Sequence, residues 1–443
     1  MARRRIARLS AAAATAAAAL VLAACSDATV APESAAAPLL ATAVRGAAPE
    51  QVMPGEVIVK LRDGADVEAV AKAHGLALGE RGYKGTFAVL RGAAAGAERA
   101  AAARLQGDAR VEYAEPNFLR QPSTIDARLW AFSNPGGLNM LFTTGRYAGL
   151  PLGASSASLV DADEDNVEGY AADGADVVVG SIDTGVDLTH PEFTGRLIAG
   201  NDWYTGDNNP SDEDGHGSHT TGTMAGTTVG VAGIAGAAPH VKVYVQRVCG
   251  RRGCPTSAIV NAIRAAADFG VVAMNISIGG SSEAQSEKDA IAYALSKNAL
   301  VIASAGNNST GTVSCPACDV NAISVAATDW RDARASYSNW GAGLDIAAPG
   351  GNCYSNTTPE GCIYSAYLAG GYAWEQGTSM AAPQVTGTAA IVASKTGLRG
   401  TALRDRILST ADDRGAPGYD TIFGNGRLNS YRAVTGTSLA AGQ

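Results

Sequence analysis

The sequence predicts an α/β fold, in which a mostly parallel sheet has helices on both faces and is preceded by a small α+β domain. From residue 173 onward, short apolar runs alternate with helical stretches, which is typical of strands buried on both faces of a parallel sheet. Gly accounts for 53 of the 443 residues and aromatic residues for only 6%. Small side chains and many tight turns argue against a fibre or a coiled coil.

The main domain is expected over residues 173–433, with a short tail at 434–443. Five apolar runs inside it are expected to form strands. They lie at residues 177–182, 241–245, 271–276, 300–304 and 322–326. In open parallel sheets, chemistry gathers at the carboxyl ends of the strands. Polar residues that directly follow these runs are therefore the first candidates for a functional site.

A separate small domain is expected upstream, over residues 54–121. Its pattern predicts strands at 56–61, 86–90 and 111–114 and helices at 66–74 and 97–106. The order resembles the β-α-β-β-α-β arrangement of ferredoxin-like modules. Residues 122–172 have only a weak pattern, and we expect either a linker or the N-terminal part of the mature main domain.

The N-terminus predicts export. Four Arg residues precede an Ala-rich apolar stretch, so residues 1–24 are assigned to a signal peptide. Leu22-Ala23-Ala24-Cys25 resembles a bacterial lipobox, which predicts lipidation of Cys25 and attachment to the membrane. The alternative is an ordinary signal peptide with a chance cysteine. Residues 25–53 are rich in Ala, Pro, Ser and Thr and are expected to form a flexible tether.

Charge is distributed unevenly along the chain. Residues 1–121 contain 15 basic and 12 acidic side chains, whereas residues 122–443 contain 19 and 30. The main domain is therefore acidic and has no basic stripe, which argues against nucleic acid as a partner. We expect a monomer.

Six cysteines remain once Cys25 is set aside, and they fall into three close pairs. The pairs are Cys249 and Cys254, Cys315 and Cys318, and Cys353 and Cys362. An even number in an exported chain favours disulfides, and proximity favours these three among the formal pairings. A four-cysteine zinc site is the alternative, but the pairs lack the flanking pattern of a zinc ribbon.

Asp183 is the first candidate for a catalytic role. The motif Ser-Ile-Asp-Thr-Gly places it at the end of a buried strand, where a carboxylate can be held rigidly and partly desolvated. Asp-Thr-Gly also occurs in aspartic proteases. Those enzymes need two copies, and this chain has one.

His216 is the second candidate. It lies between two glycines in Asp-Gly-His-Gly-Ser-His, just before an expected helix, and the glycines let substrate and neighbouring backbone come close. His219 raises the alternative of a zinc pair. A metalloprotease motif needs His-Glu-x-x-His, but here no Glu follows His216 and the spacing is three.

Ser379 and Asn307 complete the set. Ser379 lies in Gly-Thr-Ser-Met-Ala-Ala-Pro at the start of a long helical run, so its backbone N–H and the helix dipole could support an oxyanion. Asn307 follows a strand, where its amide is a suitable second donor. Alone, either residue could simply cap a helix or a turn. Together, in the order Asp, His, Ser, the motifs fit a triad in which Asp183 orients His216, the base for Ser379.

The order and local sequence of these motifs resemble the subtilase family of serine endopeptidases, over most of residues 173–430. Residues 108–117 resemble the end of the family's prodomain. The resemblance implies a prodomain that assists folding, inhibits the enzyme and is cut off near residues 118–130. Two segments are similar to those that bind the substrate backbone and line the S1 pocket. They are Ser277, Ile278, Gly279 and Gly280, and Ser304, Ala305 and Gly306.

The same resemblance implies no cofactor for catalysis but raises the question of structural calcium. Five acidic residues could supply oxygen ligands, and a solvated acidic loop is the alternative. They are Asp202, Asp207, Asp212, Glu213 and Asp214. Gln384 departs from the family pattern, in which many members have His, and the segment 351–376 is specific to a subset at most.

We expect a broad-specificity endopeptidase that acts on proteins and peptides and is extracellular once processing separates it from the lipid. Gly279 and Gly280 lie in a presumed S1 segment, 277–280, that contains no acidic residue, which favours apolar or aromatic P1 residues. One alternative is a catalytically inactive, surface-anchored binding protein on a protease scaffold, which the complete set of catalytic positions disfavours. Another is a dedicated maturation protease for one partner protein.

Overall fold

The structure is a computed structural model that describes residues 52–122, 174–227, 233–236, 238–329, 332–353 and 361–436. These residues all belong to one compact unit, Pro49–Gln443. The predicted signal peptide, Cys25 and most of the predicted tether and linker lie outside the described residues. Within the described part of the chain, no helix has the length and apolar character needed to cross a bilayer.

The main domain is built on a seven-stranded sheet in the order β13-β12-β11-β9-β5-β7-β6, and all neighbouring strands are parallel. The strands are β5 (Val177–Asp183), β6 (Leu197–Asp202), β7 (Val241–Arg247), β9 (Ala273–Ile276), β11 (Leu300–Ser304), β12 (Ala322–Thr328) and β13 (Ile346–Pro349). The five expected strands are present. The prediction misses the two edge strands, because β6 is only half-buried and β13 is only four residues long.

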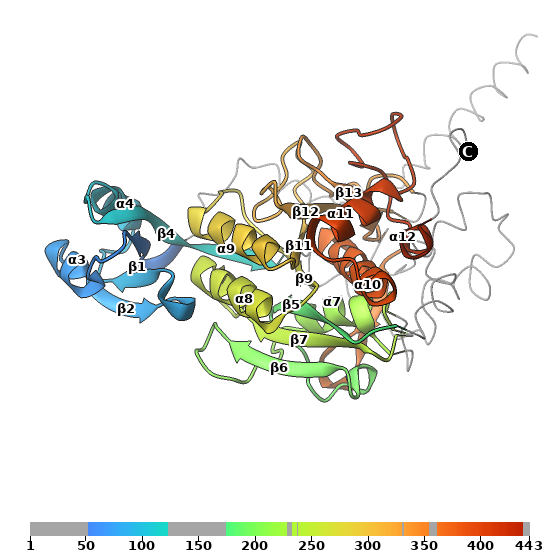
Figure 1. Cartoon of the computed structure of the whole chain (residues 1–443), viewed down its shortest axis with the longest axis horizontal. Coiled ribbons are helices and arrows are strands. Elements are labelled where there is room, and N and C mark those ends of the chain that lie inside the picture. The colour runs from blue at the N-terminus through green and yellow to red at the C-terminus, as the bar shows by residue number, and fades with distance from the viewer. Residues whose placement is uncertain are drawn as a thin grey trace, which may run out of the picture. The chain divides into compact units, whose positions relative to one another are not determined.

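Helices cover both faces of this sheet (Figure 1). One face packs against α7 (His216–Ala225) and α10 (Thr378–Thr396), and the other against α8 (Thr256–Phe269) and α9 (Gln285–Ser296). Two short helices, α11 (Gly400–Ser409) and α12 (Ser430–Thr435), join the layer of α10. Because α12 runs to Thr435, the domain extends past the predicted boundary at residue 433.

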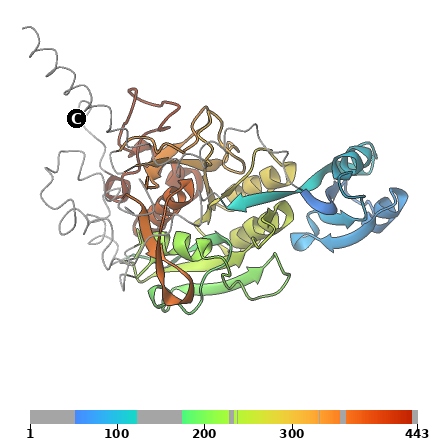
Figure 2. The ribbon, with the colours of Figure 1, turned by 180° about the vertical axis from the view of Figure 1, so that it is seen from behind.

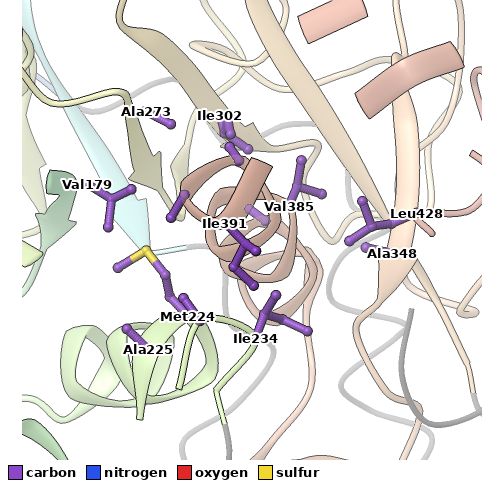
Figure 3. Close-up of a cluster of buried hydrophobic side chains, with 14 of the residues drawn as sticks. Val179, Met224, Ala225, Ile234, Ala273, Ile302, Ala348, Val385, Ile391 and Leu428 are labelled. Atoms are coloured by element: carbon purple, nitrogen blue, oxygen red, sulfur yellow. The ribbon is translucent and has the colours of Figure 1, made fainter. Parts of the chain in front are cut away.

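Helix α10 forms the centre of the larger core. Val385 and Ile391 on this helix pack among Val179, Met224 and Ile302 (Figure 3), and all five side chains are fully buried. Burying each such side chain contributes about 1.5–3 kcal/mol. The long helix, and with it the residues of its first turn, is therefore held firmly against the sheet.

The upstream domain has the expected β-α-β-β-α-β order. Its elements are β1 (Val52–Leu61), α3 (Val67–Ala73), β2 (Ala77–Arg81), β3 (Ala88–Arg91), α4 (Glu98–Gln106) and β4 (Val111–Pro122). The strands pair antiparallel in the order β4-β1-β3-β2. The domain begins two residues before the predicted boundary at 54, and β4 continues well beyond the expected residues 111–114.

A two-stranded hairpin precedes α10 in the sequence. It consists of β14 (Ile363–Ala366) and β15 (Tyr372–Glu375), which pair antiparallel. The hairpin packs against α7 (Figure 2, orange beside green). It therefore lies beside the helix that begins with His216.

Candidate active site

Asp183 and His216 come from different elements and meet at the carboxyl end of the sheet. Asp183 is the last residue of β5, and His216 is the first residue of α7. Oδ1 of Asp183 lies 2.6 Å from Nδ1 of His216. The carboxylate is fully buried and also accepts hydrogen bonds from the backbone N–H of Thr184 and the hydroxyl of Thr220. These donors fix the carboxylate so that it faces the imidazole ring.

The glycines on either side of His216 are required by close contacts. A Cβ atom on Gly217 would lie 2.0 Å from the carbonyl oxygen of Gly185, and one on Gly215 would overlap the ring of Tyr367. Gly215 also has a φ of 111°, which favours glycine. Helix α7 therefore starts close against the turn that follows Asp183, and this proximity lets the imidazole reach the carboxylate.

The environment of His216 favours its charged form. Burial opposes a charge on the ring, but the charge of Asp183 and its hydrogen bond outweigh burial and raise the pKa of His216 to about 9. The other ring nitrogen, Nε2, is buried and has no hydrogen-bond partner among the described residues. An imidazole held through Nδ1, with Nε2 able to accept a proton, is arranged as a general base.

Ser379 is the second residue of α10 and is fully buried. Its hydroxyl donates to the carbonyl oxygen of Ser277 at 3.3 Å, and the hydroxyl of Ser277 donates back to the carbonyl oxygen of Ser379 at 2.8 Å. The contacts of the described residues thus join Asp183 to His216 and Ser379 to Ser277, but they include no hydrogen bond between His216 and Ser379. Rotation about one serine side-chain bond redirects its hydroxyl, and catalytic hydrogen bonds often form only once substrate binds.

Asn307 is oriented by Thr378, the residue before Ser379. Oδ1 of Asn307 accepts hydrogen bonds from the backbone N–H and the hydroxyl of Thr378, both at 2.9 Å. The hydroxyl oxygen of Thr378 in turn accepts a hydrogen bond from the backbone N–H of Gly306 at 3.1 Å. Because the oxygen end of the amide is fixed, its NH₂ end points the opposite way. A fixed amide donor is the kind of group that stabilises an oxyanion.

The two predicted substrate-binding segments are joined by the turn at Ser314 and Cys315. Ile278 and Gly279 form the short strand β10, and the following residue, Gly280, exchanges two backbone hydrogen bonds of 2.9 Å with Cys315. On the other segment, the carbonyl oxygen of Ala305 accepts a hydrogen bond from the backbone N–H of Ser314. The structure thus brings both segments to one place.

The end of β4 occupies the edge of the predicted substrate-binding strand. Its last four residues pair antiparallel with β8 (Cys254–Pro255) and then with β10. In this register, Gln121 lies opposite Gly279 and Pro122 lies opposite Ile278. Ile278 directly follows Ser277, whose carbonyl oxygen accepts the hydroxyl of Ser379. The upstream domain therefore lies in the site in the way an extended peptide would.

Two side chains of β4 also cap helices of the main domain. The carboxylate of Glu115 accepts hydrogen bonds from the backbone N–H groups of Gln285 and Ser286, at the start of α9. Asn117 accepts one from the backbone N–H of Ser257, in the first turn of α8. Neither helix has a side-chain cap at its own N-cap residue. The upstream domain therefore provides hydrogen-bond acceptors for N–H groups that the N-cap residues of these helices do not bond.

The six cysteines form three disulfides in the pairs that sequence proximity favours. The bond between Cys249 and Cys254 flanks β8, next to the end of β4. The bond between Cys315 and Cys318 belongs to the turn that joins the two substrate-binding segments. The third bond, between Cys353 and Cys362, lies beside the β14–β15 hairpin. The disulfides thus reinforce loops around the site.

The acidic residues that we considered as calcium ligands have other partners. Arg247 forms ion pairs with both Asp202 and Glu213. Asp212 accepts hydrogen bonds from the backbone N–H and the hydroxyl of Ser218. No group of three or more His, Cys, Asp and Glu side chains converges as a metal site anywhere in the described ranges. Within the described residues, the loop thus shows no converging set of acidic ligands, and structural calcium stays a prediction.

The contacts of His219 do not fit the alternative of a zinc site formed by the two histidines. Nε2 of His219 lies 3.1 Å and 3.2 Å from the carbonyl oxygens of Ile363 and Ala373 in the β14–β15 hairpin. This nitrogen is therefore an N–H donor and not a metal ligand. Sequence reasoning missed the role of His219 in holding the hairpin and that of Thr378 in orienting Asn307. For Thr378, the position directly before the candidate nucleophile was a usable signal.

Comparison with known proteins gives matches to both domains. The model of the subtilase family matches residues 174–426, and the model of the fervidolysin N-terminal prodomain matches residues 40–117. A thermophilic serine proteinase from Bacillus sp. (strain AK1) is 36% identical over 391 residues, which are 86% of this chain and 87% of that protein. Thermitase from Thermoactinomyces vulgaris is 37% identical over 59% of this chain and 90% of its own length.

Solved structures of proteases also match this chain. Fervidolysin from Fervidobacterium pennivorans, a keratinolytic enzyme related to subtilisin, matches with a TM-score of 0.68 and 24% identity. The match covers 88% of this chain and 62% of fervidolysin, and at this identity it shows the fold alone. A lanthipeptide protease matches with a TM-score of 0.53 and 26% identity, over 61% of this chain and 94% of its own. These matches confirm the predicted α/β fold and the small α+β domain before it.

Proposed function

The chain belongs to the subtilase family, and on that basis we propose that Asp183, His216 and Ser379 form its catalytic triad, with Asn307 as an oxyanion donor. The chain is a subtilisin-like serine protease, and like other members of the family it needs no cofactor for catalysis. The contact of 2.6 Å between Asp183 and Nδ1 of His216 is the observation that carries the assignment. It leaves Nε2 as the atom that can accept a proton.

In the proposed mechanism, Oγ of Ser379 attacks the carbonyl carbon of the peptide bond while Nε2 of His216 takes its proton. The tetrahedral oxyanion is bound by the NH₂ group of Asn307 and by the backbone N–H of Ser379 at the N-terminus of α10. His216 then protonates the departing amine, which leaves an acyl-enzyme. A water molecule, deprotonated by His216, releases the acid and restores Ser379. Throughout, Asp183 holds the imidazole in one tautomer and stabilises its charge.

We propose that the upstream domain is an inhibitory prodomain that the enzyme cuts off itself. The antiparallel pairing of Gln121 and Pro122 with β10 supports this, because a product peptide would remain bound in the same way. Since the pairing leads toward Ser277 and hence toward Ser379, we propose that the scissile bond lies within about two residues after Pro122. This narrows the range of 118–130 that the sequence suggests.

For the mature enzyme, we propose a monomeric, broad-specificity endopeptidase that acts on proteins and peptides and favours apolar or aromatic P1 residues. The segments that line the candidate S1 site support this preference, because they consist of Gly, Ala, Ser and Ile. We further propose that Cys25 is lipidated and that the precursor is anchored at the cell envelope. The mature enzyme would then be extracellular.

The test of the triad compares the wild-type precursor with Ser379→Ala, both expressed as the full chain. We expect the wild type to process itself, to hydrolyse casein and to react with a fluorophosphonate probe, and the variant to do none of these. A variant that still processes itself and digests casein would exclude Ser379 as the nucleophile. A wild type that processes but fails to label would point to a different nucleophile, and a wholly inactive wild type would support the binding-protein alternative.

A further inference from the structure

The β14–β15 hairpin fixes the protonation state of His219, a buried histidine three residues after His216. Nε2 of His219 faces two carbonyl oxygens, those of Ile363 and Ala373. Carbonyl oxygens only accept hydrogen bonds, so Nε2 must carry a proton. In the neutral ring, Nδ1 then carries no proton and is an acceptor.

Nδ1 of His219 faces another hydrogen-bond acceptor, a carboxylate oxygen. It lies 3.7 Å from Oε2 of Glu375, the last residue of β15. Both atoms are buried, and neither has a hydrogen-bond partner among the described residues. Two facing acceptors in a buried position are costly unless one of them carries a proton. A single proton, carried either by the Glu375 carboxyl or by the His219 ring, removes this conflict.

The surroundings place this proton on Glu375 at neutral pH. Burial raises the pKa of Glu375 to about 8. Burial and the charge of His216 lower the pKa of His219 to about 3. Among the other titratable groups that face Glu375, some raise its pKa and others lower it. The charge of His216 lowers its pKa, the charges of Asp183, Asp212 and Asp214 raise it, and Tyr367 lies close enough to have its own pKa raised by Glu375.

Glu375 also acts on the proposed base. His216 and His219 lie one turn apart on α7, and Glu375 faces His219. From this position, the charge of Glu375 is one of the influences that raise the pKa of His216, after those of Asp183. A neutral Glu375 has no such effect. The ionised form therefore stabilises the His216 imidazolium, and a protonated imidazole cannot accept the proton of Ser379.

We propose that Glu375 is a positioning residue of the active site, which shares one proton with His219 and, once it loses that proton, holds His216 in the protonated form. The proposal rests on the proposed role of His216 as the general base. It gives the hairpin a role in catalysis that follows from its contacts with α7. The sequence does not indicate this role, because Glu375 lies in the segment 351–376, which is specific to a subset of the family at most.

The experiment measures kcat/KM against pH for the self-processed wild type and for Glu375→Gln. Glutamine keeps the shape of the side chain, and its amide can donate to Nδ1 of His219, so the hairpin should remain in place. Glu192→Gln is the matched control. Glu192 is fully buried and accepts a hydrogen bond of 2.9 Å from Tyr372, which lies on β15 like Glu375, but it is not among the groups with the largest influence on the pKa of His216.

In Glu375→Gln, we expect the midpoint of the acid limb to move to lower pH by roughly half to one unit, because a nearby negative charge has been removed. The alkaline plateau should change by no more than about twofold. Glu192→Gln should keep the wild-type midpoint. The proposal is overturned if Glu375→Gln keeps the wild-type midpoint or if both variants shift it equally.

A second measurement depends neither on activity nor on a stable variant. The contacts of His190 and of His219 each place the ring proton on Nε2. In ¹⁵N spectra of histidine-labelled wild type, whether or not it has processed itself, we expect the His219 ring to keep a protonated Nε2 and an unprotonated Nδ1 from about pH 6 to about pH 10. Its Nδ1 signal should move as Glu375 ionises. A ring protonated on both nitrogens throughout this range would exclude the shared proton on Glu375. Wild type that hydrolyses no substrate would contradict the proposed function and leave this spectroscopic result to decide the inference alone.

Discussion

At the scale of single residues, the site depends on hydrogen bonds that orient side chains before substrate arrives. Thr184 and Thr220 hold the carboxylate of Asp183, and Thr378 holds the amide of Asn307. A preorganised donor does not have to be reoriented while charge develops on the substrate. The contribution of each orienting residue should therefore appear in kcat more than in KM.

Thr378→Val tests this directly. Valine keeps the shape and the backbone N–H but removes the hydroxyl that bonds to Asn307 and Gly306. We expect kcat to fall about tenfold with KM nearly unchanged, because one hydrogen bond contributes about 1 kcal/mol and the amide becomes less well oriented. Thr386→Val is the control, since that buried hydroxyl on the same helix bonds only within the helix, to Ala382. Equal losses in both variants would mean that helix packing, and not orientation, is responsible.

The charge on His216 predicts the pH dependence of the wild type. The pKa of the ring is raised to about 9 from an ordinary value near 6.5, and in the proposed mechanism only the neutral ring accepts the proton of Ser379. Activity should therefore be lost as the pH falls below about 9, so the enzyme should be most active under alkaline conditions. A profile of kcat/KM against pH measures this midpoint. A midpoint near 6.5 would mean that Asp183 does not stabilise the imidazolium.

At the scale of elements, β4 has two roles. One part pairs with β1 within the upstream domain, and the remainder pairs with β8 and β10 of the main domain. Its side chains Glu115 and Asn117 cap α9 and α8. The strand can thus hold the two helices in place during folding and block the site afterwards.

Asn117→Ala should weaken the contact between β4 and α8. The substitution removes the cap of α8 together with hydrogen bonds to Ser257 and Glu56, and losing a cap costs about 1 kcal/mol. We expect the lag before activity appears in freshly refolded precursor to shorten several-fold, with a lower yield of folded enzyme. Glu68→Ala is the control, because Glu68 is exposed and pairs with Arg81 within the upstream domain. Identical lags for both variants would show that the cap does not control release.

Elements with a strong local pattern could be predicted, whereas those that depend on distant partners could not. The apolar run at 177–182 and the helix after Ser379 are buried on nearly all sides, so their composition alone indicates them. The second half of β4 was missed because Pro116 interrupts the alternation and its partners lie in the other domain. Glu375 was missed because a buried carboxyl differs from an exposed one only in its surroundings, which include His219 in another segment.

At the scale of the whole molecule, the inhibitor and the lipid signal lie on the same side of the proposed cut. The predicted lipid site, Cys25, and the prodomain both precede Pro122, whereas every proposed catalytic residue follows it. One cleavage would therefore open the active site and separate the enzyme from its anchor. The new N-terminus should lie within about two residues of Pro122, and N-terminal sequencing of the mature enzyme measures it. A terminus well inside the main domain would contradict the register of β4 with β10.

Release from the membrane follows from the same arrangement. In cells that produce the wild-type chain, we expect protease activity in the soluble extracellular fraction and the cleaved prodomain in the membrane fraction. If Ser379 is the nucleophile, as we propose, Ser379→Ala cannot cut the chain, and the uncleaved precursor should remain in the membrane fraction. The double variant Cys25→Ala, Ser379→Ala separates anchoring from processing, because it has neither the lipid nor the cut. We expect this variant either in the soluble fraction or retained through an uncleaved signal peptide. In both cases it should carry no lipid, and metabolic labelling with a radioactive fatty acid would show whether lipid is attached.

Mature wild-type enzyme that stays with the membrane after the prodomain has been cut would show that a second contact, not the lipid on Cys25, anchors the protease.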